Sequence, residues 1–140
     1  MTMLHGKLIH PDILAALAGS GHGSKILIAD GNFPHATQAG DQATLVYLNL
    51  SPGRVLVTEV LEAILSATPV EAAQVMQPAD GKDAPIFREF EELLGNQAHL
   101  DRLERFAFYD AASGSDTCLA VATGDQRLYA NILLTIGVVK

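Results

Sequence analysis

The sequence has very little sulfur available for cross-linking. Cys118 is the one cysteine among its 140 residues, so a disulfide within the chain is excluded. Because Cys118 stands in an apolar stretch, we interpret it as a core residue rather than a nucleophile. Nothing in this cysteine usage points to an oxidising compartment, and we expect a cytoplasmic protein.

Positive charge is also scarce. Nine lysines and arginines stand against 16 aspartates and glutamates, which gives a net charge of −7 and an isoelectric point near 5.0. Without a basic cluster the chain has no means of neutralising phosphates, so we expect neither nucleic acid nor an anionic membrane as a partner.

Long hydrophobic runs are missing as well. No apolar stretch approaches the roughly 20 residues that cross a bilayer, so we expect no membrane span. The segment from Met1 to Gly6 lacks a basic start followed by an apolar run, so we expect no signal peptide.

Several motifs that carry chemistry are absent too. The five histidines show no H-x-x-x-H spacing, and no C-x-x-C occurs, so we expect neither a metal nor another cofactor. No G-x-S-x-G elbow is present for a serine nucleophile. Residues 19–23 look faintly like a dinucleotide loop, but Ser24 breaks the G-x-G-x-x-G order and the loop precedes a strand rather than following one.

The composition that remains is that of a globular protein. With 49% hydrophobic and 18% charged residues, a chain of this length can bury about 70% of its unfolded surface, which predicts one domain over residues 1–140. Strand and helix patterns alternate, which predicts an α/β fold in three layers, with a mostly parallel sheet flanked by helices. We expect strands at 25–29, 43–50, 71–77, 100–103, 117–123 and 131–137 and a loop at 35–42. We expect helices over 10–18 and 104–112, and two further helices whose N-terminal caps are Thr58 and Asp83.

A histidine between two glycines precedes the first predicted strand. His22 has little cover from Gly21 and Gly23, and imidazole exchanges protons near neutral pH, so His22 is a candidate acid/base group. The same glycines also suit a helix cap and turn with a surface histidine. Asp30 ends that strand, where open parallel sheets bind ligands, although it also suits a plain turn.

Residues 105–109 combine a cation with aromatic rings. Phe106 and Tyr109 share one face of the predicted helix, and Arg105 precedes them, which suits a platform for a sugar, although core packing explains the rings equally well. Tyr129 and Asn131, just before the last strand, offer a hydroxyl and an amide to a polyol.

Taken in order, five segments resemble the ribose pyranase / fucose mutarotase family. They are Gly21-His22-Gly23, Asp30 with Asn32-Phe33-Pro34, Arg105-Phe106-Ala107-Phe108-Tyr109, Thr123-Gly124, and Tyr129-Ala130-Asn131-Ile132-Leu133-Leu134. The resemblance runs from about His5 to Val138. Residues 105–109 are closer to the fucose mutarotase branch, whereas Ala130 is like the ribose branch and Gly31 departs from the usual alanine of the fucose branch.

The resemblance implies an isomerase. By it, His22 is the catalytic residue, and Asp30, Arg105, Tyr129 and Asn131 contact the substrate. The reaction would interconvert the α and β anomers of a free monosaccharide, L-fucose or a related pyranose, by acid/base ring opening. Family members need no metal or organic cofactor and form ring-like homo-oligomers, which implies an octamer or decamer here.

Three other interpretations stay open. The first is a non-catalytic monosaccharide-binding or transport accessory protein on the same fold. The second is an isomerase or lyase acting on an open-chain sugar, which ordinarily uses a metal or a Schiff-base lysine. The third is a structural α/β protein. Whether the sugar is fucose, ribose or another monosaccharide is also open.

Overall fold

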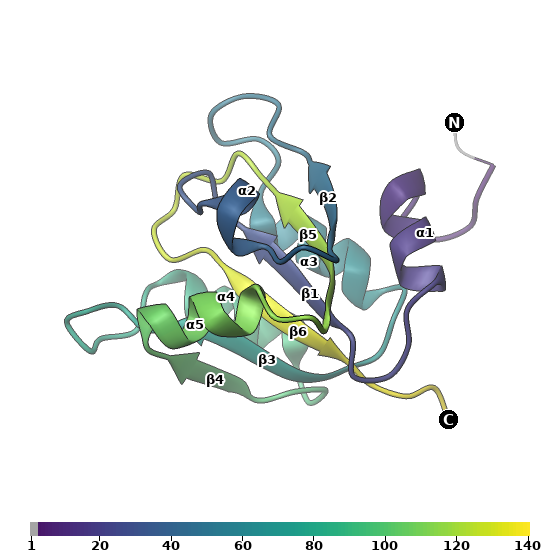
Figure 1. The fold of residues 1–140 in the computed structure, drawn as a ribbon. Coiled ribbons are helices and arrows are strands. Elements are labelled where there is room, and N and C mark those ends of the chain that lie inside the picture. The colour runs from purple at the N-terminus through teal and green to yellow at the C-terminus, as the bar shows by residue number, and fades with distance from the viewer. Residues whose placement is uncertain (1–2) are drawn as a thin grey trace.

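This computed structural model describes residues 3–140. They form a six-stranded sheet and five helices (Figure 1). Met1 and Thr2, which belong to the predicted domain and to the segment judged to lack a signal peptide, lie outside the described residues. The elements are α1 (Pro11–Ala18), β1 (Lys25–Ala29), α2 (His35–Gln38), β2 (Thr44–Tyr47), α3 (Val57–Leu65), β3 (Val70–Met76), α4 (Ile86–Leu94), β4 (Leu100–Leu103), α5 (Arg105–Ala112), β5 (Thr117–Ala122) and β6 (Ile132–Ile136).

The sheet is mixed but mostly parallel, which confirms the predicted fold class. Its strand order is β2-β5-β1-β6-β3-β4. β1 to β5 all run in one direction, and β6 lies antiparallel between β1 and β3. The ends of β1 to β5 therefore lie together with the start of β6, at what we call the carboxyl edge. The opposite side, where β1 to β5 start and β6 ends, is the amino edge.

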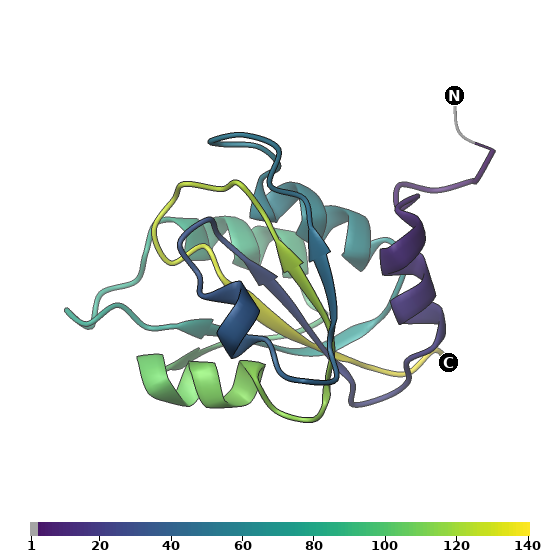
Figure 2. The same ribbon diagram turned by 45° about the horizontal axis from the view of Figure 1, so that its top comes forward.

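Helices cover both faces of this sheet. α3 and α4 lie on one face and α2 and α5 on the other, with α1 at the side of the sheet near β2 (Figures 1 and 2). Side chains of β1 alternate between two cores. Ile26 and Ile28 pack with α1, α3 and α4, whereas Leu27 packs with Phe33 and Phe108 on the α2 and α5 side. The continuous apolar sequence of β1 follows from burial on both faces.

Two helix caps predicted from the local sequence are wrong. Thr58 does not cap α3, because the helix begins at Val57, whose N–H donates to the remote carboxylate of Asp125 at 3.0 Å. Asp83 does not cap α4 either, and it accepts hydrogen bonds from Arg102 Nε at 3.0 Å and Nη2 at 2.8 Å. In both cases a long-range partner replaces the local one.

The predicted loop at 35–42 contains a short helix, α2. Its start follows Pro34, which presets the backbone angle of a first helical turn. The helix places His35 in the interior, against the ring of Tyr47 at a centroid distance of 5.2 Å.

Candidate functional site

Asp30 follows β1 at the carboxyl edge. It is only 5% exposed. Its backbone N–H donates to Asn131 Oδ1 at 2.8 Å, and its carboxylate accepts from the N–H of Asn32 at 2.9 Å. Asn131 comes into reach because β6 is the antiparallel neighbour of β1, with Ile28 opposite Ile132. The structure thus brings two of the predicted sugar-contacting residues together.

Burial sets the electrostatics of Asp30. Desolvation raises the pKa of Asp30 above its ordinary value, and the nearby carboxylate of Asp125 adds to the rise. Backbone N–H groups of Asn32, Ala130 and Phe33 oppose it by stabilising the ionised form. Asp30 is therefore a strong hydrogen-bond acceptor in a poorly hydrated place, where a donated hydroxyl hydrogen bond is worth more than in water.

Arg105 reaches the same edge from the start of α5. Its guanidinium lies over the rings of Phe106 and Tyr109, at 5.4 and 5.5 Å from their centroids, and its Nε donates to the Tyr109 hydroxyl at 3.4 Å. The ring of Tyr109 in turn meets Phe33 edge-on at 5.6 Å. Because Phe33 stands three residues after Asp30, this aromatic chain links Arg105 to the end of β1.

Tyr129 precedes β6 and completes this group. Its side chain packs against both cores, and it lines an opening of about 560 Å³ together with Pro78, Pro85 and Leu128. Asp30, Arg105, Tyr129 and Asn131 therefore all lie at the carboxyl edge, as the sequence predicts for ligand-binding residues of a parallel sheet.

A second, more polar cleft of about 670 Å³ opens beside Asp30. Amide and hydroxyl side chains dominate its wall: Asn32, Asn49, Ser51, Thr123 and Gln126. His35 also lines it, but both ring nitrogens are buried without a hydrogen-bond partner among residues 3–140, and desolvation lowers the pKa of His35. Amides and hydroxyls beside the carboxylate of Asp30 give a cleft that can both donate hydrogen bonds to a polyol and accept them from it.

His22 lies elsewhere. It stands in the loop between α1 and β1, at the amino edge, where the N–H of Gly23 donates to the carbonyl of Ile136 at 2.9 Å. Its side chain is 59% exposed. At ~3.3 Å per residue, the five residues of β1 alone separate this edge from Asp30 by about 13 Å. Within one chain, His22 and Asp30 do not face one another.

A carboxylate that the sequence analysis missed lies beside His22. Nε2 of His22 forms a short contact with Oε1 of Glu71, the second residue of β3. The sequence shows only that Glu71 starts a strand after Pro69. The pair depends on the sheet order, because β6 alone separates β1 from β3 at this edge. A carboxylate that accepts from one imidazole nitrogen fixes the orientation and the tautomer of the ring.

Within residues 3–140 the structure contains no cluster of three or more histidine, cysteine, aspartate or glutamate side chains that would hold a metal ion. Over the same residues, no helix has the length and apolar character needed to cross a membrane.

Comparison with known proteins shows to which family the chain belongs. Residues 3–139 match the RbsD / FucU transport protein family. The chain belongs to this family. A curated member, fucose mutarotase of Danio rerio, is 34% identical over 99% of this chain and 96% of its own length.

Two solved structures of the RbsD/FucU family share the fold. Fucose mutarotase from Streptococcus pneumoniae, in complex with L-fucose, aligns with a TM-score of 0.82 and 29% identity over all of both chains. Bacillus subtilis RbsD, complexed with D-ribose, aligns with a TM-score of 0.83 and 25% identity over 99% of this chain and 100% of its own. The identities favour the fucose mutarotase side of the family, as residues 105–109 indicate.

Proposed function

We propose that this protein is a monosaccharide mutarotase, an isomerase that interconverts the α and β anomers of L-fucose or a closely related free pyranose. The observation that carries the proposal is the gathering of Asp30, Arg105, Tyr129 and Asn131 at one sheet edge. These side chains offer acceptors and donors to several hydroxyls at once. The fucose mutarotase relatives and the L-fucose complex of the S. pneumoniae protein support the choice of reaction and sugar.

The reaction requires proton transfer at two oxygens. The sugar ring opens when its ring oxygen gains a proton and the anomeric hydroxyl loses one, and it closes again after rotation about the bond to C1. A positioned acid/base group contributes about 10²–10⁴-fold to such a step. We assign this group to His22, held by Glu71, while the four residues at the carboxyl edge hold the hydroxyls of the open chain.

Because His22 lies at the amino edge, the proposed site combines two copies of the chain. Asp30 and its neighbours come from one subunit, and His22 of the partner subunit supplies the acid/base group. Exposed apolar side chains beside both halves support this contact: Phe106 (64%) and Leu128 (68%) at the carboxyl edge, and Val138 and Val139 just after β6 at the amino edge.

A contact between two different edges is head-to-tail. Repeated around a closed rotation, it produces a ring. We therefore propose a ring-like homo-oligomer, of octamer or decamer size, in the cytoplasm.

The experiment that tests the function is anomer exchange measured by saturation-transfer NMR, with L-fucose, D-ribose and other monosaccharides. We expect the wild-type protein to accelerate the exchange of L-fucose, and His22→Ala to lower the rate by about 10²–10⁴-fold. His99→Ala is the matched control, because His99 is another exposed histidine beside a carboxylate, Asp101, and it lies outside the site. A wild-type rate in His22→Ala would contradict the role of His22.

Glu71 has a separate test. Glu71→Gln keeps a side chain that can hydrogen-bond to His22 but removes the negative charge. We expect kcat to fall by about tenfold or more with KM nearly unchanged, because a carboxylate can only accept and so fixes which ring nitrogen carries the proton, whereas an amide can also donate, and because Glu71 holds no sugar hydroxyl. An unchanged kcat would show that Glu71 has no part in the proton transfer.

The second candidate is a non-catalytic sugar-binding or transport accessory protein, in line with the description of the family as transport proteins, but the curated fucose mutarotase relatives do not favour it. It predicts saturable binding of the sugar without faster anomer exchange. The same NMR experiment distinguishes it from the mutarotase.

A further inference from the structure

Tyr129 has an unusual backbone. Among the non-glycine residues of 3–140 it alone has a positive φ, at 60°. A bulky residue rarely adopts this conformation, because its Cβ crowds the backbone, and the conformation persists only where the surrounding structure enforces it. Asn131, two residues later, holds the downstream side of Tyr129 by accepting the N–H of Asp30.

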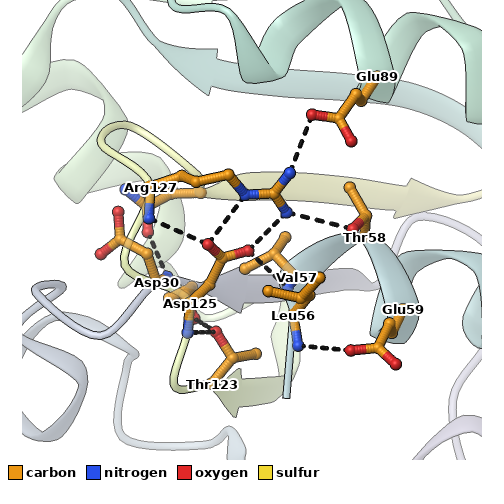
Figure 3. A network of polar contacts seen from close by, with 11 residues as sticks. Asp30, Leu56, Val57, Thr58, Glu59, Glu89, Thr123, Asp125 and Arg127 are labelled. Atoms are coloured by element: carbon orange, nitrogen blue, oxygen red, sulfur yellow. Dashed lines mark hydrogen bonds and ion pairs between the residues drawn. The ribbon is translucent and has the colours of Figure 1, made fainter. Parts of the chain in front are cut away.

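The upstream side is held by an ion pair. Arg127 wraps around the carboxylate of Asp125: Nε donates to Oδ1 at 3.0 Å, Nη2 donates to Oδ2 at 2.8 Å, and the backbone N–H of Arg127 donates to Oδ1 at 3.0 Å (Figure 3). Such a fork fixes both distance and direction. It locks residues 125–127 into one conformation immediately before Tyr129.

Asp125 is a firm anchor for this fork. It has no exposed surface, and its Oδ2 also accepts the N–H of Val57 at the start of α3. Its backbone is tied to the end of β1, since the N–H of Gly31 donates to the Asp125 carbonyl at 2.8 Å. The N–H of Asp125 donates to Thr123 Oγ1 at 3.2 Å.

Arg127 uses its remaining donors on two helices. Nη2 donates to Thr58 Oγ1 at 3.2 Å on α3, and Nη1 donates to Glu89 Oε2 at 2.9 Å on α4 (Figure 3). The guanidinium therefore ties the segment before β6 to the helical layer on one face of the sheet. Without it, Asp125 would be a buried carboxylate with no cation beside it.

We propose that Arg127 is a positioning residue that holds Tyr129 in its left-handed conformation, so that Tyr129 and Asn131 meet the sugar in a fixed arrangement. Arg127 acts through the backbone of residues 127–129 and through Asp125, and its side chain also lines the opening beside Tyr129. The statement about the backbone stands by itself, whereas the consequence for the sugar rests on the proposed function.

A double-mutant cycle tests the backbone statement without any activity. The free energy of unfolding in urea is measured for the wild type, Arg127→Ala, Tyr129→Gly and the double variant. Glycine adopts positive φ without strain. Arg127→Ala in the wild-type background loses the ion pair but lets Tyr129 relax, which offsets part of the loss. With Tyr129→Gly no strain is left to release, so we expect Arg127→Ala to cost more there. Equal costs in both backgrounds would overturn the proposal.

Sugar kinetics test the consequence. We expect Arg127→Ala to raise KM for the sugar about tenfold or more with a smaller change in kcat, because Tyr129 and Asn131 hold hydroxyls in both the bound and the reacting sugar. Arg102→Ala is the matched control: Arg102 makes the same kind of fork with Asp83 and also lies near a glutamate of α4, Glu91, but it stands on β4, which β3 separates from β6. It should keep the wild-type KM although it also loses an ion pair.

Arg127→Lys covers the case in which Arg127→Ala does not fold. Lysine keeps the positive charge near Asp125 but has no planar fork, so we expect an intermediate KM. A folded Arg127→Ala or Arg127→Lys with the wild-type KM would overturn the proposal. If the wild type itself did not accelerate anomer exchange, the proposed function would fail, while the unfolding cycle would still decide whether Arg127 holds Tyr129.

Discussion

A site built from two subunits predicts that two inactive variants restore each other. His22→Ala removes the proposed acid/base group at the amino edge, and Asp30→Asn removes the carboxylate at the carboxyl edge, at least the length of β1 away. Each variant alone should be inactive, since every site in its homo-oligomer lacks one half. In a mixed oligomer, some sites combine His22 from an Asp30→Asn subunit with Asp30 from a His22→Ala subunit.

The size of the recovery follows from the geometry. In a random one-to-one mixture each half of a site is intact in half of the subunits, so about one site in four is intact when the two halves come from different chains. A site contained within one chain would give no intact site at all. About a quarter of the wild-type rate is far above the residual rate expected after loss of a positioned acid/base group.

The assay is anomer exchange of L-fucose by saturation-transfer NMR, on co-expressed variants carrying different affinity tags and purified through both. Each variant purified alone is the first control, and the two variants mixed just before the measurement, without time to exchange subunits, are the second. A co-expressed sample no faster than the average of the two separate variants would refute a site shared between subunits.

The other predictions concern buried carboxylates. Because burial raises the pKa of Asp30 in the folded chain, the folded state binds the proton of the Asp30 carboxyl more tightly than the unfolded state does. The free energy of unfolding should therefore fall as pH rises from about 4 through the native pKa. Urea unfolding should show this fall in the wild type but not in Asp30→Asn. Asp125→Asn removes the anion from the fork with Arg127, whose side chain is partly exposed to solvent. It should lower the free energy of unfolding by about 2–3 kcal/mol, which corresponds to a fall of roughly 6–10 °C in Tm. Asp83→Asn, in the more exposed fork with Arg102, should lower Tm clearly less. Both variants are compared by thermal unfolding at the same protein concentration. Equal falls in Tm would contradict the role given to burial.

Asp125 also has a pH signature of opposite sign. Burial opposes its ionisation, but hydrogen bonds from Arg127 and Val57 outweigh burial and hold the pKa of Asp125 below its ordinary value. The stability it contributes is therefore present above the ordinary pKa of an aspartate and is lost as pH falls through the lower native pKa. Asp30 and Asp125, close together at one edge, respond to acid in opposite directions.

Sequence patterns located most strands and helices because a helix buries one side and a strand buries one or both faces against its neighbours. The spacing of apolar residues along the sequence reflects which sides are buried. The run Ile26-Leu27-Ile28 reads as a buried strand for this reason. The caps at Thr58 and Asp83 were wrong because their partners, Asp125 and Arg102, are far along the chain.

The sequence by itself determined the α/β class, all of the elements except α2, the family resemblance and the residues to examine. Asp30 could be placed at a ligand-binding edge because it follows a strand of a parallel sheet, and the carboxyl ends of parallel strands all lie at the edge where ligands bind. Only the tertiary structure decided which of these residues meet. Strand order lies outside any local pattern, so the sequence did not reveal that Glu71 lies beside His22, or that Asn131 lies beside Asp30. The contacts of Arg127 with α3 and α4, two residues before the positive φ of Tyr129, likewise exist only once the sheet and its helices have packed.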